Sequence, residues 1–265
     1  DWSPKNARFA ASSASKAGYD FIEILVAEPE KIDVAMTKDL LQEFNLGASG
    51  CFVLNAKTDI SSTDKSIVKA GEDLFRSAID KVAAIGGIEL DGPMASSLQP
   101  YDQPATKEGR ANSVAVMKRM ADYAAGKGVN INIEIVNRYE SNLMNTAVEG
   151  LQYLQEVDKP NVYLHLDTYH MNIEEDGMVS GVLAAKDKIG YIHIGESHRG
   201  YLGTGNVDFD SFFGALHKIG FKGTITFESF SSAVVSKDLS NTLGIWRNLW
   251  TDNKSMAKSA REYME

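Results

Sequence analysis

Short apolar runs rich in β-branched residues recur roughly 30–45 residues apart along the chain, and helical patterns fill the intervals. Repeated βα units of this kind build a parallel sheet. No linker or low-complexity stretch divides the sequence, so we predict one α/β domain over residues 1–265. The predicted strands are Tyr19–Val26, Gly50–Leu54, Ile85–Leu90, Asn130–Val136, Asn161–Leu166, Gly190–Ile194 and Gly223–Phe227.

Helix starts are expected where a small polar residue precedes an apolar pattern of helical spacing. Ser62 or Thr63 is expected to cap one helix, and Asp208 a later one. Another helix is expected from near Asn142. These helices connect successive strands, as βα units require.

The pattern within the later strands separates two architectures. An open doubly wound sheet is covered by helices on both faces, so its strands are apolar on both. Side chains alternate between faces along a strand, and here four strands have one apolar and one polar face. In a barrel the polar faces converge inside, at the C-terminal strand ends where barrel enzymes place their sites. We therefore predict a (β/α)8 TIM barrel, with polar strand ends at Glu134, Asp167, His193 and Glu228.

Three carboxylates directed at one axis repel one another and, left unpaired, destabilise the fold. A divalent cation removes that repulsion. Three oxygen ligands with one imidazole suit Mn²⁺, Co²⁺ or Mg²⁺. The alternative is a hydrogen-bonded polar layer inside the barrel. The predicted metal ligands are Glu134, Asp167, His193 and Glu228.

Several other polar residues lie near these strand ends. His170 follows Asp167 by three positions, so a loop can bring it to the same pocket. On spacing alone, Glu140 and Arg199 fit surface charges better than site residues. His165 is expected one layer deeper, either as a buried, hydrogen-bonded histidine or as a partner that supports the site residues. Glu23 faces inward as a structural polar group.

Composition excludes several classes of protein. The chain has 27 Lys+Arg and 36 Asp+Glu, a formal net charge of −9, which disfavours a nucleic-acid partner. Its single cysteine, Cys51, cannot form an intramolecular disulfide. No apolar run reaches the roughly 18 residues that span a membrane, and the start, DWSPKNARFA, has no signal-peptide core. We predict a cytoplasmic protein with no membrane partner.

Two further features allow more than one interpretation. The stretch Gly200–Gly205 (GYLGTG) can cradle a phosphate or form a lid over the pocket. It is neither a Walker loop nor a Rossmann fingerprint. Trp246 and Trp250 are four residues apart and are expected on the last helix, in packing or a subunit contact.

Four segments carry long and specific motifs: IEIVNRYESNLMNTA (133–147), HLDTYHMNIEE (165–175), HIGESHRGYLGTGNVDF (193–209) and FESFSS (227–232). They closely resemble the ketose 3-epimerases, a group of xylose isomerase-like barrels that includes D-tagatose, D-psicose (D-allulose) and L-ribulose 3-epimerases. The resemblance covers most of the chain and is strongest from about residue 130. Earlier parts match more loosely, in pieces such as GYDFIEI (18–24).

The resemblance implies the same four metal ligands that the strand faces select, usually with Mn²⁺ or Co²⁺. It also implies a homodimer or homotetramer. The substrate-binding residues that it implies are Glu140, His170, Arg199 and, by a looser match, Trp2.

The implied activity is inversion of C3 of a free ketose, as in D-fructose/D-psicose, D-tagatose/D-sorbose or L-ribulose/L-xylulose. This reaction removes a proton beside the C2 carbonyl and returns it to the opposite face, through an enediolate. Metal contact with O2 and O3 would stabilise that species. Glu134 and Glu228 are the predicted catalytic pair, one removing the proton and the other donating it.

The resemblance also shows a departure at the N-terminus. Ketose 3-epimerases begin with a short strand, the first of eight, whereas only seven strands are predicted here. The chain starts at Asp1 without an initiator methionine. We expect either a native start roughly a dozen residues upstream or an unfilled seam between the second and eighth strands of the barrel.

Other activities are compatible with the same scaffold. An aldose–ketose isomerase, an inosose dehydratase or a sugar-phosphate epimerase is the nearest alternative. An endonuclease-IV-like DNA repair enzyme would need more histidines and a basic groove. A non-enzymatic sugar-binding protein would not need two glutamates at a metal.

Overall fold

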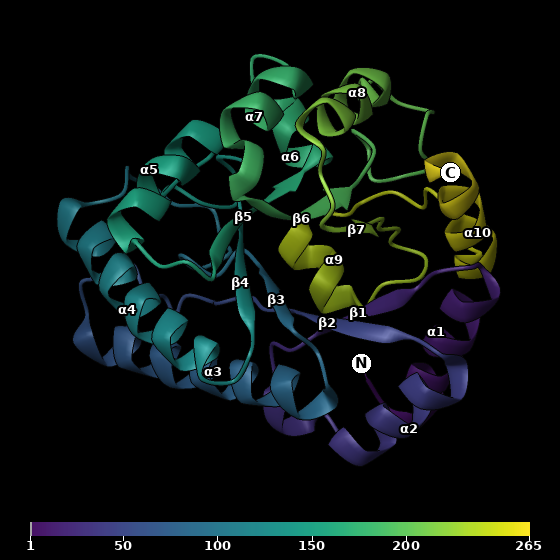
Figure 1. Ribbon diagram of the computed structural model, residues 1–265, viewed down its shortest axis with the longest axis horizontal. Helices are drawn as coiled ribbons and strands as arrows, with labels where there is room; N and C mark the ends of the chain where they lie inside the picture. The colour runs from purple at the N-terminus through teal and green to yellow at the C-terminus, as the bar shows by residue number, and fades with distance from the viewer. Residues whose placement is uncertain (1) are drawn as a thin grey trace.

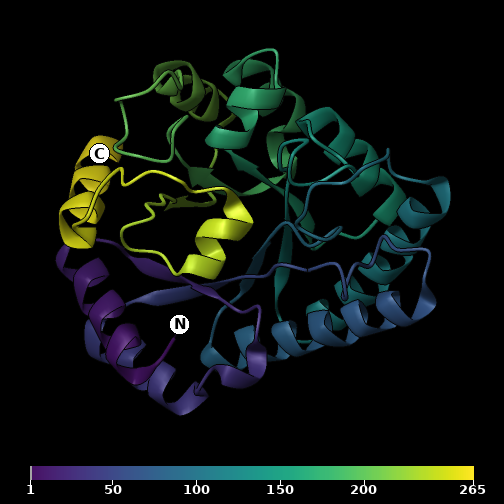
Figure 2. The ribbon, with the colours of Figure 1, turned by 180° about the vertical axis from the view of Figure 1, so that it is seen from behind.

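Seven parallel strands pair in chain order, from β1 to β7, and helices surround the curved sheet that they form (Figures 1 and 2). This is a computed structural model, and it describes residues 2–265. The TIM barrel fold expected from the alternation is confirmed. The strands are β1 (Phe21–Leu25), β2 (Gly47–Cys51), β3 (Glu89–Gly92), β4 (Asn130–Glu134), β5 (Val162–Asp167), β6 (Ile189–Ile194) and β7 (Thr224–Phe227).

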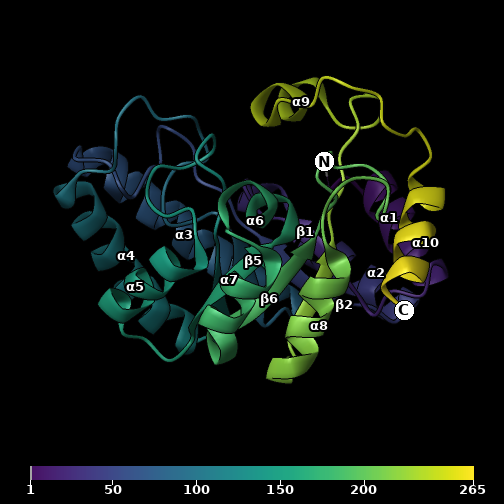
Figure 3. The same cartoon turned by 90° about the horizontal axis from the view of Figure 1, so that it is seen from above.

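The helices pack outside the sheet, apart from α9, which lies over one end of it (Figure 3). Two short 3₁₀ helices, η1 (Pro29–Lys31) before α2 and η2 (Lys186–Lys188) after α7, lie in the connections between helices and strands. The helices are α1 (Pro4–Lys16), α2 (Val34–Phe44), α3 (Lys65–Ile85), α4 (Lys107–Ala125), α5 (Ala147–Val157), α6 (Thr168–Glu174), α7 (Met178–Ala185), α8 (Phe209–Ile219), α9 (Lys237–Leu243) and α10 (Asn253–Met264).

The hydrophobic core lies between the sheet and the outer helices. Outward-facing strand residues such as Ile131, Ile133 and Leu164 are fully buried there. Burying each such side chain contributes about 1.5–3 kcal/mol. The inner face of the sheet is polar instead, as the alternation predicts, and includes the buried side chains of His165 and His193. The expected hydrogen bond of His165 is absent, because neither of its ring nitrogens has a partner among residues 2–265 and the ring packs edge-on against Tyr191 and His193.

The sheet has seven strands, as predicted, and an open seam. Within residues 2–265, no strand joins β1 to β7. A groove of about 610 Å³ follows this seam, and side chains from both edge strands line it, among them Ile22, Glu23, Ile225 and Phe227.

Two predicted strand ranges are displaced. The strand predicted at Gly50–Leu54 is β2, at Gly47–Cys51, and the one predicted at Ile85–Leu90 is β3, at Glu89–Gly92. A Cβ added at Gly50 would lie 2.4 Å from Val82 Cγ2, so helix α3 packs directly against β2. This close approach selects small residues in β2, which is why an apolar pattern locates the strand poorly.

Helix caps are partly as predicted. Asp208 caps α8, where its carboxylate accepts from the Ser211 N–H. Helix α3 is capped by Asp64, however, and not by Ser62 or Thr63. Helix α5 begins several residues after Asn142, where Thr146 forms a capping box with Glu149. Asp and Thr satisfy free N–H groups as well as serine does, so residue type alone does not choose between neighbours.

Candidate active site

Parallel register brings the polar strand ends together. Asp167 at the end of β5 pairs with His193 on β6, and Glu134 at the end of β4 pairs with His165 on β5. The N–H of Glu228 donates to the Ile194 carbonyl at 3.0 Å, which extends the pairing of β6 and β7 by one residue. All four predicted metal ligands therefore lie at one rim of the barrel.

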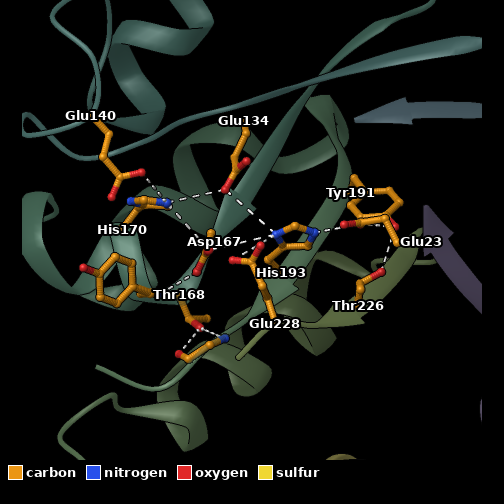
Figure 4. A network of polar contacts seen from close by, with 12 residues as sticks. Glu23, Glu134, Glu140, Asp167, Thr168, His170, Tyr191, His193, Thr226 and Glu228 are labelled. Carbon is orange, nitrogen blue, oxygen red and sulfur yellow. Dashed lines mark hydrogen bonds and ion pairs between the residues drawn. The ribbon is translucent and has the colours of Figure 1, made fainter. Parts of the chain in front are cut away.

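The carboxylates of the other three ligands converge on His193 Nδ1 (Figure 4). This nitrogen lies 3.9 Å from Glu134 Oε1, 4.0 Å from Asp167 Oδ2 and 3.7 Å from Glu228 Oε2. Ligand atoms of Glu134, Asp167 and His193 lie within 4.8 Å of one another. The side chain of Glu228 is 22% exposed, whereas the others are buried.

Local structure directs one oxygen of Asp167 into this cluster. Asp167 caps α6, and its Oδ1 accepts from the Tyr169 N–H at 2.6 Å. The second oxygen, Oδ2, is then directed toward His193. Thr168 ties the ends of β5 and β6 together, because its hydroxyl donates to the Gly195 carbonyl and accepts from the Gly195 N–H.

His193 is oriented as a metal-ligating histidine would be. Its Nε2 donates to Glu23 Oε2 at 2.8 Å, so Nδ1 is the nitrogen that faces the other carboxylates. Burial disfavours a charged ring, but Glu23, Glu228 and Glu134 outweigh it and raise the pKa of His193 well above its usual range, so the site favours positive charge. Nδ1 is buried and has no hydrogen-bond partner among residues 2–265. A lone pair facing three carboxylates is unfavourable unless a cation lies between them. The donor set therefore fits a divalent metal ion, as the sequence predicts.

His170 lies beside the cluster, in a defined tautomer. The Asn137 backbone N–H and side-chain amide both donate to His170 Nδ1, at 3.1 and 2.8 Å, while Arg199 Nη2 lies 3.3 Å from Nε2. Two shorter contacts at Nδ1 outweigh the one at Nε2 and favour a proton on Nε2. His170 Nε2 lies 3.5 Å from Glu134 Oε1 and 4.0 Å from Glu140 Oε2. Burial lowers the pKa of His170 to about 3, which keeps the ring neutral. It therefore presents one N–H to the pocket.

Arg199 joins the cluster from the loop after β6. Its Nη1 contacts Asp167 Oδ2 and Glu228 Oε2, and its guanidinium lies 3.8 Å from the centroid of the Tyr169 ring. Arg199 adopts a left-handed conformation with φ 61°, which is strained for a side chain of this size. A Cβ at Gly195 would lie 2.9 Å from Arg199 Nη1, so this glycine leaves room for the guanidinium.

The carboxylates differ in their electrostatics. Burial, together with Glu228 and Asp167, raises the pKa of Glu134 well above its usual range. Burial also raises the pKa of Glu228. Burial acts in the same direction on Asp167, but Arg199, followed by His170 and His193, outweighs it and lowers the pKa of Asp167. Asp167 is therefore the most firmly ionised of the three.

A pocket of about 210 Å³ opens beside Arg199, between the cluster and α9. Glu140 and Tyr169 line its polar side, and Phe230 and Trp246 contribute apolar surface. The prediction that Trp246 and Trp250 lie on the last helix is wrong, because both precede α10. This segment crosses the barrel end, where the Trp250 indole N–H donates to Ser229 Oγ at 2.8 Å.

The glycine-rich loop after β6 is closed around a carboxylate of its own. Glu196 is fully buried, and its two oxygens accept from the N–H groups of Ser197, Gly203 and Val207. These amides are the ones a bound phosphate would use. The loop is therefore organised around Glu196, a residue that its glycine pattern does not reveal.

Seven of the eight predicted site residues converge here. Trp2 does not join them, because its indole N–H donates to Thr37 Oγ1 on α2 at 2.8 Å and its ring lines the seam groove. Sequence reasoning missed Asn137 and Tyr169, which lie within the quoted motifs, and underestimated Glu23. Asn137 could have been noticed as an amide at the strand end, three residues after Glu134.

A parallel βα barrel whose strand ends gather carboxylates, imidazoles and an arginine beside a pocket defines an enzyme of the TIM barrel class. The chain belongs to the xylose isomerase-like TIM barrel family, which matches residues 11–263. None of the helices in residues 2–265 is both long and apolar enough to cross a bilayer.

Individual relatives narrow the assignment. The chain is 59% identical to L-ribulose 3-epimerase of Methylomonas sp. (strain DH-1), covering 100% of this chain and 93% of that protein. It is 48% identical to ketose 3-epimerase of Arthrobacter globiformis, covering 97% and 89%. A crystal structure of D-allulose 3-epimerase from Methylomonas sp. with D-allulose matches with a TM-score of 0.98 and 59% identity, over 100% of this chain and 92% of that one. These relatives are epimerases, and the chain is an enzyme of the isomerase class.

Proposed function

We propose that this enzyme is a ketose 3-epimerase that inverts C3 of free ketoses such as L-ribulose, D-psicose and D-fructose. The observation that supports this most is the convergence of Glu134, Asp167 and Glu228 on the unpartnered Nδ1 of His193. Relatives at 48–59% identity act as L-ribulose or ketose 3-epimerases. A solved relative contains D-allulose.

Glu134, Asp167, His193 and Glu228 would hold one divalent ion. Oxygen-rich ligands with one imidazole favour Mn²⁺ or Co²⁺, and Mg²⁺ is compatible. Such an ion supplies Lewis-acid polarisation of the ketose C2 carbonyl, which acidifies the C3 proton.

Glu134 and Glu228 would exchange that proton. They come from β4 and from the end of β7, so their carboxylates approach the shared space from different sides. One removes the C3 proton from one face and the other donates a proton to the opposite face, with the roles exchanged in the reverse reaction. Both side chains must be within hydrogen-bond reach of C3 in the bound sugar.

Glu140, His170 and Arg199 would orient the end of the ketose next to C3. His170 Nε2–H and the Arg199 guanidinium donate to sugar oxygens, whereas the Glu140 carboxylate accepts from a hydroxyl. Fixing the ketose in this way lowers the barrier by positioning. A sugar-binding role for Trp2 stays a prediction from the sequence, since its indole is bound to Thr37 on α2.

A free ketose fits this site better than a phosphorylated one. The N–H groups of the glycine-rich loop are already used by Glu196. The Glu196 carboxylate would also repel a phosphate, while Arg199 is paired with Asp167 and Glu228. The homodimer or homotetramer and the cytoplasmic location stay predictions from the sequence.

The test is C3 epimerisation by Glu134→Gln and Glu228→Gln, with bound Mn²⁺ measured for each variant. We expect at least a ~100-fold lower kcat for both, the scale of a lost acid–base group. Glu149→Gln, at the exposed start of α5, is the control and should turn over normally. Near-normal turnover by either site variant would refute the two-glutamate scheme, and aldose formation by the unmodified enzyme would favour an isomerase instead.

A further inference from the structure

We propose that Glu23 is a positioning residue for His193 and, through it, sets the affinity of the site for its divalent ion. This inference rests on the proposed metal-dependent function. Glu23 lies on β1, at the seam, 170 positions from His193 along the chain. The barrel brings the two together across its interior (Figure 4).

The contact with His193 is short and well supported. Glu23 Oε2 accepts from His193 Nε2–H at 2.8 Å and from the Tyr191 hydroxyl at 2.8 Å. The Tyr191 hydroxyl also contacts Ser49 Oγ at 2.8 Å and Thr226 Oγ1 at 2.7 Å. Strands β1, β2, β6 and β7 therefore all fix the position of the Glu23 carboxylate.

Packing prevents the imidazole from turning away from this carboxylate. The His165 ring lies edge-on to the His193 ring, with centroids 4.1 Å apart and an interplanar angle of 84°. The Tyr191 ring lies on another side, at 5.8 Å. With Nε2–H held by Glu23, Nδ1 is directed at Glu134, Asp167 and Glu228.

A carboxylate on the distal N–H of a ligating imidazole has two effects. It fixes the tautomer and ring orientation, and it makes the free nitrogen a stronger donor. Loss of such a partner commonly weakens metal binding 10- to 100-fold. Glu23 therefore contributes to the metal site without touching either the ion or the sugar.

The same interior layer holds two other groups of possible ligand atoms, one of Asp91, His165 and His193 and one of Glu23, Cys51 and Asp91. Only the second group contains Glu23. Ligand atoms of Glu23, Cys51 and Asp91 lie within 4.8 Å of one another, as they would around a second ion. In that case Glu23 would bind metal directly, and the chain would take two ions. Metal stoichiometry separates the two arrangements.

The experiment titrates metal-stripped protein with Mn²⁺ by calorimetry, without substrate. We expect one Mn²⁺ per chain for the unmodified protein. Glu23→Ala should bind Mn²⁺ about 10- to 100-fold more weakly. Glu23→Gln should lose less Mn²⁺ affinity than Glu23→Ala, because its amide oxygen still accepts from Nε2–H. Some affinity should still be lost, because the amide carries no charge. Glu89→Gln removes a half-buried carboxylate on β3 that contacts Asn132, and it should bind Mn²⁺ normally.

Rescue distinguishes positioning from general damage to the fold. At saturating Mn²⁺, Glu23→Ala should recover most of its kcat, whereas a misfolded barrel would not. Unchanged Mn²⁺ affinity in both Glu23 variants, or two Mn²⁺ per chain with one lost in Glu23→Ala, would overturn the proposal. If the unmodified enzyme binds Mn²⁺ but epimerises no ketose, the proposed function fails while the Glu23 inference can still be judged.

Discussion

Arg199 Nη1 lies 2.9 Å from Asp167 Oδ2, at the C-terminal ends of the barrel strands. The same nitrogen is 2.6 Å from Glu228 Oε2, and the guanidinium stacks on Tyr169. One side chain thus links two of the proposed metal ligands to the pocket wall. Its planar shape and permanent charge both serve this contact.

Arg199→Lys should therefore be far from conservative. Lysine keeps the charge but loses the stacking on Tyr169 and the flat geometry. We expect kcat/KM for the preferred ketose to fall about 100-fold, the scale of a misplaced substrate. Steady-state kinetics measure this, with Arg119→Lys at the surface pair with Glu72 as the control. Equal kcat/KM for the two variants would contradict a role for the Arg199 geometry.

Asn137 should determine which nitrogen of His170 carries the proton. In Asn137→Asp, a carboxylate replaces the amide donor facing Nδ1, which favours a proton on Nδ1 and removes it from Nε2. Loss of one buried hydrogen bond costs about 1–3 kcal/mol, roughly 5- to 150-fold in kcat/KM. Asn137→Ser leaves the backbone donor at 3.1 Å and should be milder. If Asn137→Asp and Asn137→Ser are equally active, the tautomer of His170 does not affect catalysis.

Metal removal should destabilise the whole barrel. Without a cation, the three carboxylates around His193 repel one another in a buried site. An ion at 100 times its Kd adds about 2.7 kcal/mol of stability, or roughly 5–10 °C in Tm for a chain of this size. Thermal denaturation after chelation, with and without added Mn²⁺ or Co²⁺, measures the shift. Asp167→Asn should abolish most of it, and an unmodified enzyme insensitive to every divalent ion would exclude the site.

Glu196→Gln should loosen the glycine-rich loop. Oε1 accepts from Ser197 and Val207, and Oε2 accepts from Gly203, so an amide must direct N–H toward N–H at one end. A mismatch of this kind costs about 1–3 kcal/mol. We expect faster proteolysis within 197–207 and weaker ketose binding. Unchanged cleavage would show that the loop does not depend on Glu196.

Two helix glycines should respond oppositely to alanine. A Cβ at Gly71 in α3 would lie 2.1 Å from the Thr58 carbonyl oxygen, whereas a Cβ at Gly214 in α8 meets nothing within 4 Å. Gly214→Ala should stabilise by up to about 1 kcal/mol through helix propensity. Gly71→Ala should destabilise by about 1–3 kcal/mol through overpacking. Denaturant unfolding compares the two, and similar shifts would mean that the contact at Thr58 is readily relieved.

The sequence predicts the barrel and its rim because the relevant signals are local. Side chains alternate along a strand, so Glu134 and Asp167 share the interior face whatever lies around them. Displaced β2 and the cap at Asp64 show the limit of such signals. The close packing of α3 against Gly50 decided where β2 lies, and a choice among adjacent polar residues decided where α3 begins.

The partners within the site depended on the tertiary structure. Nothing near Glu23 in the chain indicates that it holds His193, and nothing near Asn137 indicates that it orients His170. Trp2 and Trp246 likewise took places that their neighbours in sequence do not fix. The face of a strand is set by backbone geometry over two residues, and the sequence alone determined it. The distance between two strands depends on how the whole sheet curves, and only the folded barrel decided it.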